Sequence, residues 1–205
     1  MEYCAGRTLN DLCRGTELGE RQILDYLRQI VDGIRYLHEG KTPIFHGDIK
    51  GDSIFLTEDS KVCKLGDLEN FQLLLTEKKV NDGTLRHLSH EMLEYVYGTE
   101  EEDDTLLALI AHESDIWSIG CTVLEMVGRG EVQFKGADKT PMTVEAKKVK
   151  TFLKQVKSGA CPDQSIAERE LSEKFSFIVT WCLMKEPSAR PTAAVLQGVL
   201  DTMCP

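Results

Sequence analysis

The segment Asp115–Val127 constrains the fold of this chain more than any other, because it is apolar on nearly every side. Its apolar positions are Ile116, Trp117, Ile119, Cys121, Val123, Leu124, Met126 and Val127. A helix that is hydrophobic all round has no face for water, so it is buried in a protein core. Ser114 is a suitable N-cap, and Gly128-Arg129-Gly130 is expected to end the helix. We therefore expect a domain whose other elements pack around residues 115–127.

Periodic patterns elsewhere predict further helices and one small hairpin. Residues 20–39 carry apolar side chains three and four positions apart, which is typical of an amphipathic helix, and Gly40 is expected to end it. Ile54–Leu56 and Val62–Leu65 flank a polar turn and predict two short strands. Other helices are expected over residues 8–13 (with Thr8 as N-cap), 91–95, 143–157, 171–184 and 192–202. The predicted fold class is mainly α with a small β-hairpin.

Composition limits the class of protein. The 205 residues suffice for one domain with a sizeable core. The net charge of −10 disfavours nucleic acid or an anionic membrane as partner, and no apolar run reaches the roughly 18 residues of a membrane span. The seven cysteines include no C-x-x-C pair, which indicates reduced thiols, and the N-terminus lacks the pattern of a signal peptide. We expect a cytoplasmic protein.

A polar stretch of eight residues, His46 to Ser53, lies between the long helical pattern and the first predicted strand. Further motifs follow in order: Asp67-Leu68-Glu69, then Gly83-Thr84 with Ser89-His90-Glu91, then Asp115 to Cys121, then Arg190-Pro191-Thr192. In order and spacing these motifs resemble the catalytic loop, metal-binding motif, activation segment, central helix and late arginine of protein kinases. The run Ile49-Lys50-Gly51 is most similar to the Ste group, which includes the mitogen-activated protein kinase kinase kinases. The resemblance extends over nearly the whole chain.

The resemblance implies transfer of the γ-phosphoryl group of ATP to a protein hydroxyl. Asp48 would orient the acceptor hydroxyl, Lys50 would neutralise charge on the phosphoryl group, and Thr84 is assigned to the same catalytic group. Asp67 and Ser53 would hold Mg²⁺. The residues expected to bind ATP are Glu2, Cys4 and Phe55. Phe55 would lie under the adenine ring, and it can serve core packing as well. Lysine at position 50 resembles Ser/Thr kinases rather than tyrosine kinases, and the expected partner is a protein substrate or signalling protein.

Several positions depart from the family pattern. Gly47 stands where the family has Arg, Ser53 where it has Asn, Leu68-Glu69 where it has Phe-Gly, and His90 where it has Pro. Residues 1–6 resemble the hinge between the kinase lobes, and no G-x-G-x-x-G occurs in the chain. We therefore expect a partial kinase domain over residues 1–205. It would comprise the hinge and the C-terminal lobe, with an activation segment over residues 67–91 and without the N-terminal lobe.

Two functions remain open at this point. Asp48, Lys50 and Asp67 favour a Ser/Thr kinase, whereas the altered positions favour a pseudokinase that binds partners without catalysis. The chain alone is expected to be inactive. Apolar surface around Phe55 and Leu68 is expected to make it associate.

Charged residues carry three further expectations. Glu91 and Arg190 are expected to form a partly buried bidentate ion pair. The acidic run Glu100–Asp104 and the polar segment 76–79 are expected on the surface. The lysines at positions 147, 148, 150, 154 and 157 fit a solvated helix face better than a binding patch.

Overall fold

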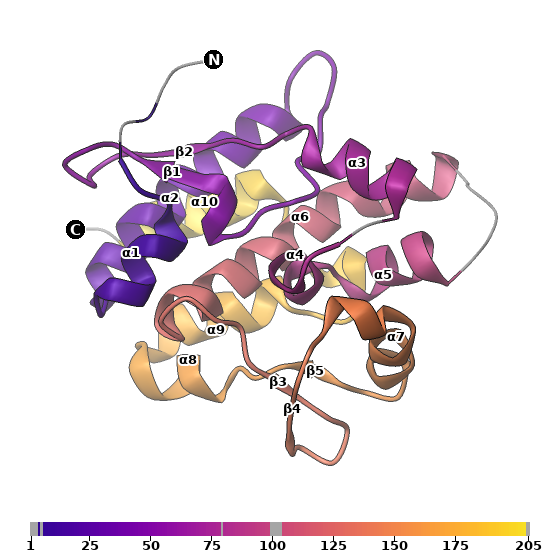
Figure 1. Ribbon diagram of the computed structural model, residues 1–205. Coiled ribbons are helices and arrows are strands. Elements are labelled where there is room, and N and C mark those ends of the chain that lie inside the picture. Colours follow the sequence, from indigo (N-terminus) through magenta and orange to yellow (C-terminus); the bar gives the residue numbers. More distant parts are fainter. Residues whose placement is uncertain (1–3, 5, 79, 99–103, 204–205) are drawn as a thin grey trace.

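Helix α6 (Asp104–Val127) forms the centre of the molecule (Figure 1). The computed structural model describes residues 4, 6–78, 80–98 and 104–203. Between residues 116 and 126 the large apolar side chains of α6 are at most 7% exposed, so this part of the helix is buried on every side. Helix α6 packs against α1 (Leu9–Gly15), α2 (Glu20–His38), α5 (His90–Tyr97) and α9 (Glu173–Cys182). The expected central helix is confirmed.

The chain before residue 66 supplies two helices and a hairpin. Thr8 caps α1 through a capping box, in which its hydroxyl accepts from the Asp11 N–H and the Asp11 carboxylate accepts from the Thr8 N–H. Helix α2 is amphipathic, as its pattern predicts, and buries one face against α6. The 3-10 turn η1 (Gly51–Ser53) leads into β1 (Ile54–Leu56), which pairs antiparallel with β2 (Cys63–Leu65). The predicted first helices and hairpin are confirmed.

The segment between β2 and α6 is more helical than the sequence pattern suggests. It contains α3 (Asn70–Glu77), α4 (Asp82–His87) and α5. The expectation of a surface loop over residues 76–79 is wrong for its first half, because α3 continues to Glu77 before Lys78 takes a left-handed conformation with φ of 50°. Leu74 explains the difference: its side chain is 3% exposed, so packing holds a turn that polar composition alone does not favour.

The C-terminal part of the chain carries a second sheet. Strands β3 (Phe134–Lys135), β4 (Pro141–Met142) and β5 (Cys161–Pro162) are antiparallel in the order β4-β3-β5. The expectation of a single hairpin is therefore wrong, since strands of two residues leave no alternating pattern to read. The remaining elements are η2 (Ala146–Lys148), α7 (Val149–Lys157), α8 (Ser165–Glu170), η3 (Pro187–Ala189) and α10 (Ala193–Met203). Helix α10 lies along α2 (Figure 1).

The start of α6 differs from its prediction. Ser114 is not an N-cap, because the helix already begins at Asp104. The Ser114 hydroxyl instead lies inside the fold, 2.8 Å from the Ser89 hydroxyl. The acidic run Glu100–Asp104, expected on the surface, lies outside the described residues except for Asp104, at which α6 begins.

The ion pair expected from residues 99 positions apart is confirmed. Arg190 Nη1 lies 2.5 Å from Glu91 Oε1, and Nη2 lies 3.0 Å from Glu91 Oε2. Arg190 also donates to the Glu113 and Met184 carbonyls, and its guanidinium lies 5.0 Å from the centre of the Trp117 ring. Among the described residues, no helix combines the length and apolarity needed to cross a membrane.

Candidate functional site

Asp48, Lys50 and Thr84 form a buried triangle of side chains. Lys50 Nζ lies 2.5 Å from Asp48 Oδ2 and donates to Thr84 Oγ1 at 2.8 Å. The Thr84 hydroxyl in turn donates to Asp48 Oδ1 at 3.0 Å. The structure therefore brings together the three residues predicted as the catalytic group, although Thr84 is separated from Asp48 by 36 positions.

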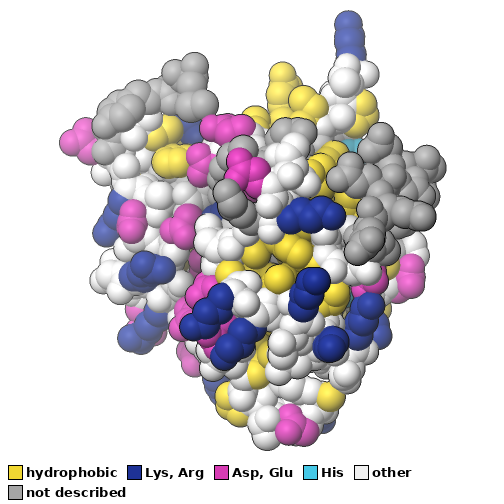
Figure 2. Space-filling view, turned by 45° about the vertical axis from the view of Figure 1, so that its right-hand side comes forward, with side chains coloured by type: hydrophobic (Ala, Val, Ile, Leu, Met, Phe, Trp, Pro, Cys, Tyr) yellow, Lys and Arg dark blue, Asp and Glu magenta, His cyan; other side chains and the backbone are white. Residues whose placement is uncertain are grey.

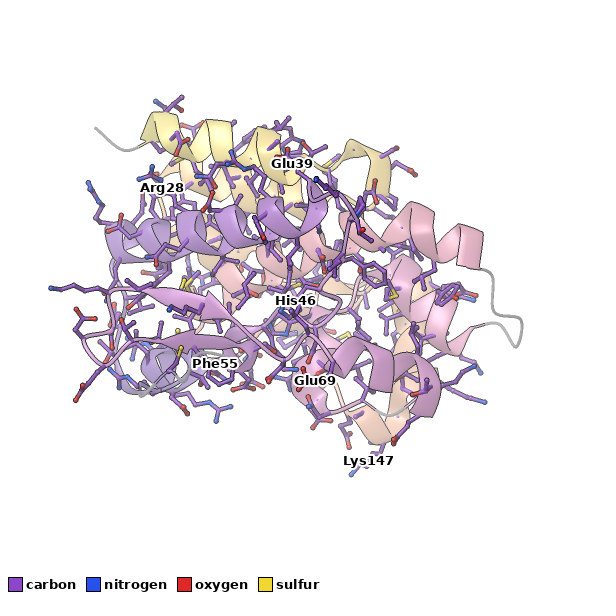
Figure 3. The ribbon with its side chains drawn as sticks, turned by 90° about the horizontal axis from the view of Figure 1, so that it is seen from above. Arg28, Glu39, His46, Phe55, Glu69 and Lys147 are labelled. Carbon is purple, nitrogen blue, oxygen red and sulfur yellow. The ribbon has the colours of Figure 1, made fainter. Side chains whose placement is uncertain are left out.

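Two carboxylates of α6 hold the loop that carries Asp48 and Lys50. Asp115 accepts from the backbone N–H of His46 and of Gly47, each at 2.8 Å. Glu125 accepts from the Gly51 N–H at 2.7 Å. The contacts fix both ends of the loop to the buried central helix. In Figure 3, His46 lies near the centre of the molecule, while Phe55 and Glu69 lie nearer its rim.

Helix α4 positions Thr84. The Asn81 side chain accepts from the Thr84 N–H at 2.8 Å and so caps the helix. At the next position Asp82 accepts from the Ala146 N–H at 2.6 Å, which ties α4 to the turn that precedes α7. The short helix is thus fixed at its N-cap by Asn81 and at its outer side by Asp82, which keeps the Thr84 hydroxyl directed at Asp48.

Ser53 and Asp67, the predicted metal ligands, lie near this triangle: the Ser53 N–H donates to the Lys50 carbonyl at 3.0 Å, and the charges of Lys50 and Asp48 act on the pKa of Asp67. The Ser53 hydroxyl is fully buried and has no hydrogen-bond partner within the described residues, while its carbonyl accepts from the Gly66 N–H at 3.0 Å. Burial raises the pKa of Asp67 above its ordinary value, and the Glu69 carboxylate raises it further. No group of three or more His, Cys, Asp or Glu side chains in the described part of the chain is arranged to hold a metal ion.

The predicted nucleotide-binding residues are only partly defined by the structure. Glu2 lies outside the described residues, and Cys4 is half-buried. Phe55 is half-buried and packs against Gly66, where an added Cβ would lie 2.6 Å from the Phe55 ring. A packing role for Phe55 is therefore present, whatever its relation to ATP.

The structure adds three residues to the site that the sequence did not suggest. His38 contacts Asp115, with 2.9 Å between Nε2 and Oδ2. His87 lies with Nε2 3.3 Å from Glu125 Oε2 and Nδ1 2.8 Å from the Gly83 carbonyl oxygen. The sequence does contain a clue to Glu125: it is a carboxylate within an otherwise apolar helix, and a buried carboxylate needs a hydrogen-bond partner.

His90 occupies the position where the family pattern has Pro. Its Nδ1 lies 3.1 Å from Glu91 Oε2, and its ring meets Trp117 edge-on at 6.1 Å between centroids. Burial lowers the pKa of His90, so the neutral imidazole is favoured beside the Glu91–Arg190 pair. The substitution is thus accommodated by packing.

Comparison with known proteins places this geometry in a family. The protein kinase domain family matches residues 1–199. The chain is 29% identical over 201 residues to mitogen-activated protein kinase kinase kinase nsy-1 of Caenorhabditis elegans, with 94% of the chain covered. It is 32% identical over 202 residues to serine/threonine-protein kinase dst1 of Dictyostelium discoideum, with 96% covered. It is also 30% identical over 201 residues to mitogen-activated protein kinase kinase kinase 18 of Arabidopsis thaliana, with 96% covered.

The matches cover only part of each relative: 12% of nsy-1, 24% of dst1 and 52% of mitogen-activated protein kinase kinase kinase 18. Within that part, the family match spans the catalytic-loop motif, the segment carrying Thr84 and the Glu91–Arg190 pair. The mostly helical fold with small antiparallel sheets and the matched sequence agree. The chain belongs to the protein kinase family and is similar to Ser/Thr kinases of the mitogen-activated protein kinase kinase kinase type.

Proposed function

We propose that this chain is a Ser/Thr protein kinase lobe that positions a protein hydroxyl but does not by itself turn over ATP. The buried triangle of Asp48, Lys50 and Thr84 carries the proposal. In it Asp48 orients the acceptor hydroxyl, and Lys50 supplies a positive charge for the transferring phosphoryl group. Thr84 contacts both side chains, so it fixes their separation.

The residues present fit a Mg²⁺ ion bound with ATP. Mg²⁺ takes oxygen ligands, and the Ser53 hydroxyl is a buried oxygen without a partner in the described part of the chain. The raised pKa of Asp67 means that its negative charge is poorly compensated, which a divalent cation would relieve. Asp67 and Ser53 would therefore hold the ion, which when bound neutralises charge on the phosphates. Phe55 and Cys4 stay candidates for contact with the adenine, and Glu2 is kept with them on the family resemblance.

The same residues support the absence of turnover. Phosphoryl transfer depends almost entirely on positioning and on neutralising charge, so a misplaced metal ligand raises the barrier to transfer. Ser53 offers one hydroxyl on a short arm where the family has a carboxamide. Glu69 adds a negative charge beside Asp67, which repels phosphate oxygens. Each loss of about 1.4 kcal/mol in transition-state stabilisation slows the reaction about tenfold.

A direct assay tests this function. The purified chain is incubated with Mg²⁺, γ-labelled ATP and a generic protein substrate rich in Ser and Thr, beside the Asp48→Asn variant as a control for contaminating kinases. We expect equal background labelling in both samples. Labelling by the wild-type chain that Asp48→Asn abolishes would overturn the proposal. Ser53→Asn alone is not expected to restore transfer, because Glu69 still adds its negative charge beside Asp67.

A second candidate, a pseudokinase that acts only as an interaction module, is favoured by the same altered positions Ser53 and Glu69. The two candidates differ in nucleotide binding. Isothermal titration with ATP and Mg²⁺ separates them: binding lost in Asp67→Asn supports the kinase lobe, and no measurable binding in the wild-type chain supports the interaction module.

A further inference from the structure

Helix α7 and the turn before it carry a stripe of lysines on one side. Lys150, Lys154 and Lys157 are four and three residues apart, which places them on one face of α7, and Lys147 precedes them in η2. All of them are exposed, and we call them the lysine stripe. Figure 2 shows dark blue side chains gathered on the face of the molecule to which α7 belongs, around a small hydrophobic area.

The stripe carries more positive charge than its neighbours neutralise. Lys147 pairs with Glu145 at 3.0 Å, and Lys157 pairs with Glu94 at 2.6 Å. Lys150 and Lys154, in the middle, form no ion pair with any described residue. A local surplus of lysine is unusual for a chain whose net charge is −10. It indicates a surface that attracts anions while the rest of the molecule repels them.

The opposite face of α7 holds the stripe in place. Phe152 and Leu153 are buried, and the Phe152 ring meets Phe134 edge-on at 5.3 Å between centroids. Helix α7 also packs against α5. The lysine stems therefore project from a fixed backbone, so a ligand that binds them meets a preformed arrangement of charges.

One hydrogen bond connects the start of the stripe with the helix that carries Thr84, a member of the buried triangle with Asp48 and Lys50. The Asp82 carboxylate accepts from the Ala146 N–H, immediately before Lys147. Asp82 lies two residues before Thr84, whose hydroxyl contacts Asp48 and Lys50. The stripe thus starts next to the segment that positions the catalytic group and leads away from it. In Figure 3, Lys147 projects outward from the rim of the molecule.

We propose that the lysine stripe binds an acidic segment of the protein whose hydroxyl is presented to Asp48. The proposal rests on the proposed function in calling that partner a substrate. The two ends of the stripe are ten positions apart in the chain, about 15 Å at the helical rise, which matches roughly five residues of an extended acidic peptide. Carboxylates on such a segment would pair with Lys150 and Lys154, and they would be steered towards the site by the same charges.

Binding to a defined probe tests the stripe without requiring turnover. The probe is a fluorescein-labelled peptide with about five glutamates beside one serine, matched to the stripe length; a peptide with glutamine in place of each glutamate is the neutral comparison. Fluorescence anisotropy is measured for the wild-type chain and for the double variant Lys150→Glu/Lys154→Glu. We expect the double variant to bind the acidic peptide about tenfold or more weakly, because two attractions become repulsions. We also expect binding by the wild-type chain to weaken as salt is raised.

The matched control is Lys41→Glu/Lys174→Glu, which makes the same change of charge at exposed lysines outside the stripe. It should bind nearly as the wild-type chain does, and all variants should keep the wild-type melting temperature. The labelling assay does not depend on the stripe: labelling that Asp48→Asn abolishes would overturn the proposed function alone, and equal binding of the acidic and glutamine peptides would overturn the docking site alone. Equal loss in both double variants, equal affinity for the glutamine peptide, or tighter binding of single-stranded RNA than of the acidic peptide would overturn the inference.

Discussion

At the scale of single residues, two positions at the site share a left-handed backbone: Gly47 has φ of 72° and Asp67 has φ of 60°. Glycine takes this conformation without steric cost, whereas a side chain there pays roughly 1–2 kcal/mol, less for Asp or Asn. Glycine at position 47, where the family has Arg, therefore avoids backbone strain, whereas Asp67 retains some of it. Burial and Glu69 add an electrostatic cost to the same residue, since both raise the pKa of Asp67.

We predict that Asp67→Asn stabilises the folded chain at neutral pH. A raised pKa means that ionisation of Asp67 is harder in the folded state, so the stability it contributes is present at low pH and lost as pH rises through its folded pKa. Asn removes the charge and tolerates the left-handed backbone. Thermal unfolding should show a higher melting temperature for the variant near pH 7, and the difference should shrink towards about pH 4, where a free carboxyl protonates.

Asp59→Asn is the matched control for this prediction, with the opposite sign. Asp59 is exposed, and the Thr57 hydroxyl that bonds to it lowers its pKa. Its stability contribution is therefore present at neutral pH and lost on acidification, so this variant should melt slightly lower than the wild-type chain near neutrality. A melting temperature for Asp67→Asn equal to or below the wild-type value at neutral pH would contradict the electrostatic account.

Sequence reasoning at this scale identified Asp48, Lys50 and Thr84 through a family motif, and the structure brings them together. It did not find Glu125 or His87 as neighbours of the loop. Their contacts depend on which side of α6 faces residue 51, and the apolar pattern of a helix buried on all sides does not encode that rotation.

At the scale of elements, the Glu91–Arg190 pair joins the start of α5 to the end of η3. The guanidinium is completely buried and the Glu91 side chain is 11% exposed. Arg190 also satisfies the Glu113 carbonyl of α6, so one side chain links three parts of the helical core. Removing it leaves Glu91 as a buried charge without its main partner.

Arg190→Met should therefore lower the free energy of unfolding by about 3–5 kcal/mol, as expected for one side of a buried pair. Denaturant unfolding measures the change. Arg129→Met is the control, since Arg129 pairs with Glu17 on the surface, where the side chains are 68% and 73% exposed. Its effect should stay below about 1 kcal/mol. A similar decrease in the free energy of unfolding for both variants would mean that the buried ion pair stabilises the fold no more than the surface pair does.

Elements with strong periodicity were predictable and elements held by tertiary contacts were not. The amphipathic pattern gave α2, and the Thr8 capping signal gave the start of α1. Helix α3 was missed because its sequence is ambiguous and Leu74 fixes it only through the core. The three strands around β3 were missed because they are too short to alternate.

At the scale of the whole molecule, the core surrounds α6 and encloses most of the described cysteines. Cys13, Cys63, Cys121 and Cys182 are buried, whereas Cys161 is exposed. Burial raises the pKa of Cys13, Cys63 and Cys182 to about 12 and that of Cys121 still higher. These thiols are therefore protonated and shielded from reagents at neutral pH.

Alkylation with iodoacetamide should reflect this arrangement. In the native chain Cys161 should be labelled before the four buried cysteines, which should react only as fast as the molecule unfolds globally. Peptide mass spectrometry after timed quenching gives the rate for each site. Labelling in denaturant, where all seven cysteines should react alike, is the reference. Fast native labelling of Cys121 would be incompatible with a closed core around α6.

The hydrogen bonds that Asp115 accepts from the His46 and Gly47 N–H groups have a consequence for the order of folding. Its two backbone contacts span 69 and 68 positions of chain, so they form only after a large loop has closed. Helix α2 can form early from local contacts, yet residues 46–51 have no fixed shape until α6 has docked beside it. A partly folded chain would therefore contain Asp48, Lys50 and Thr84, but these side chains would not yet lie together. The nascent chain cannot form the contacts among Asp48, Lys50 and Thr84 until its long-range topology is complete.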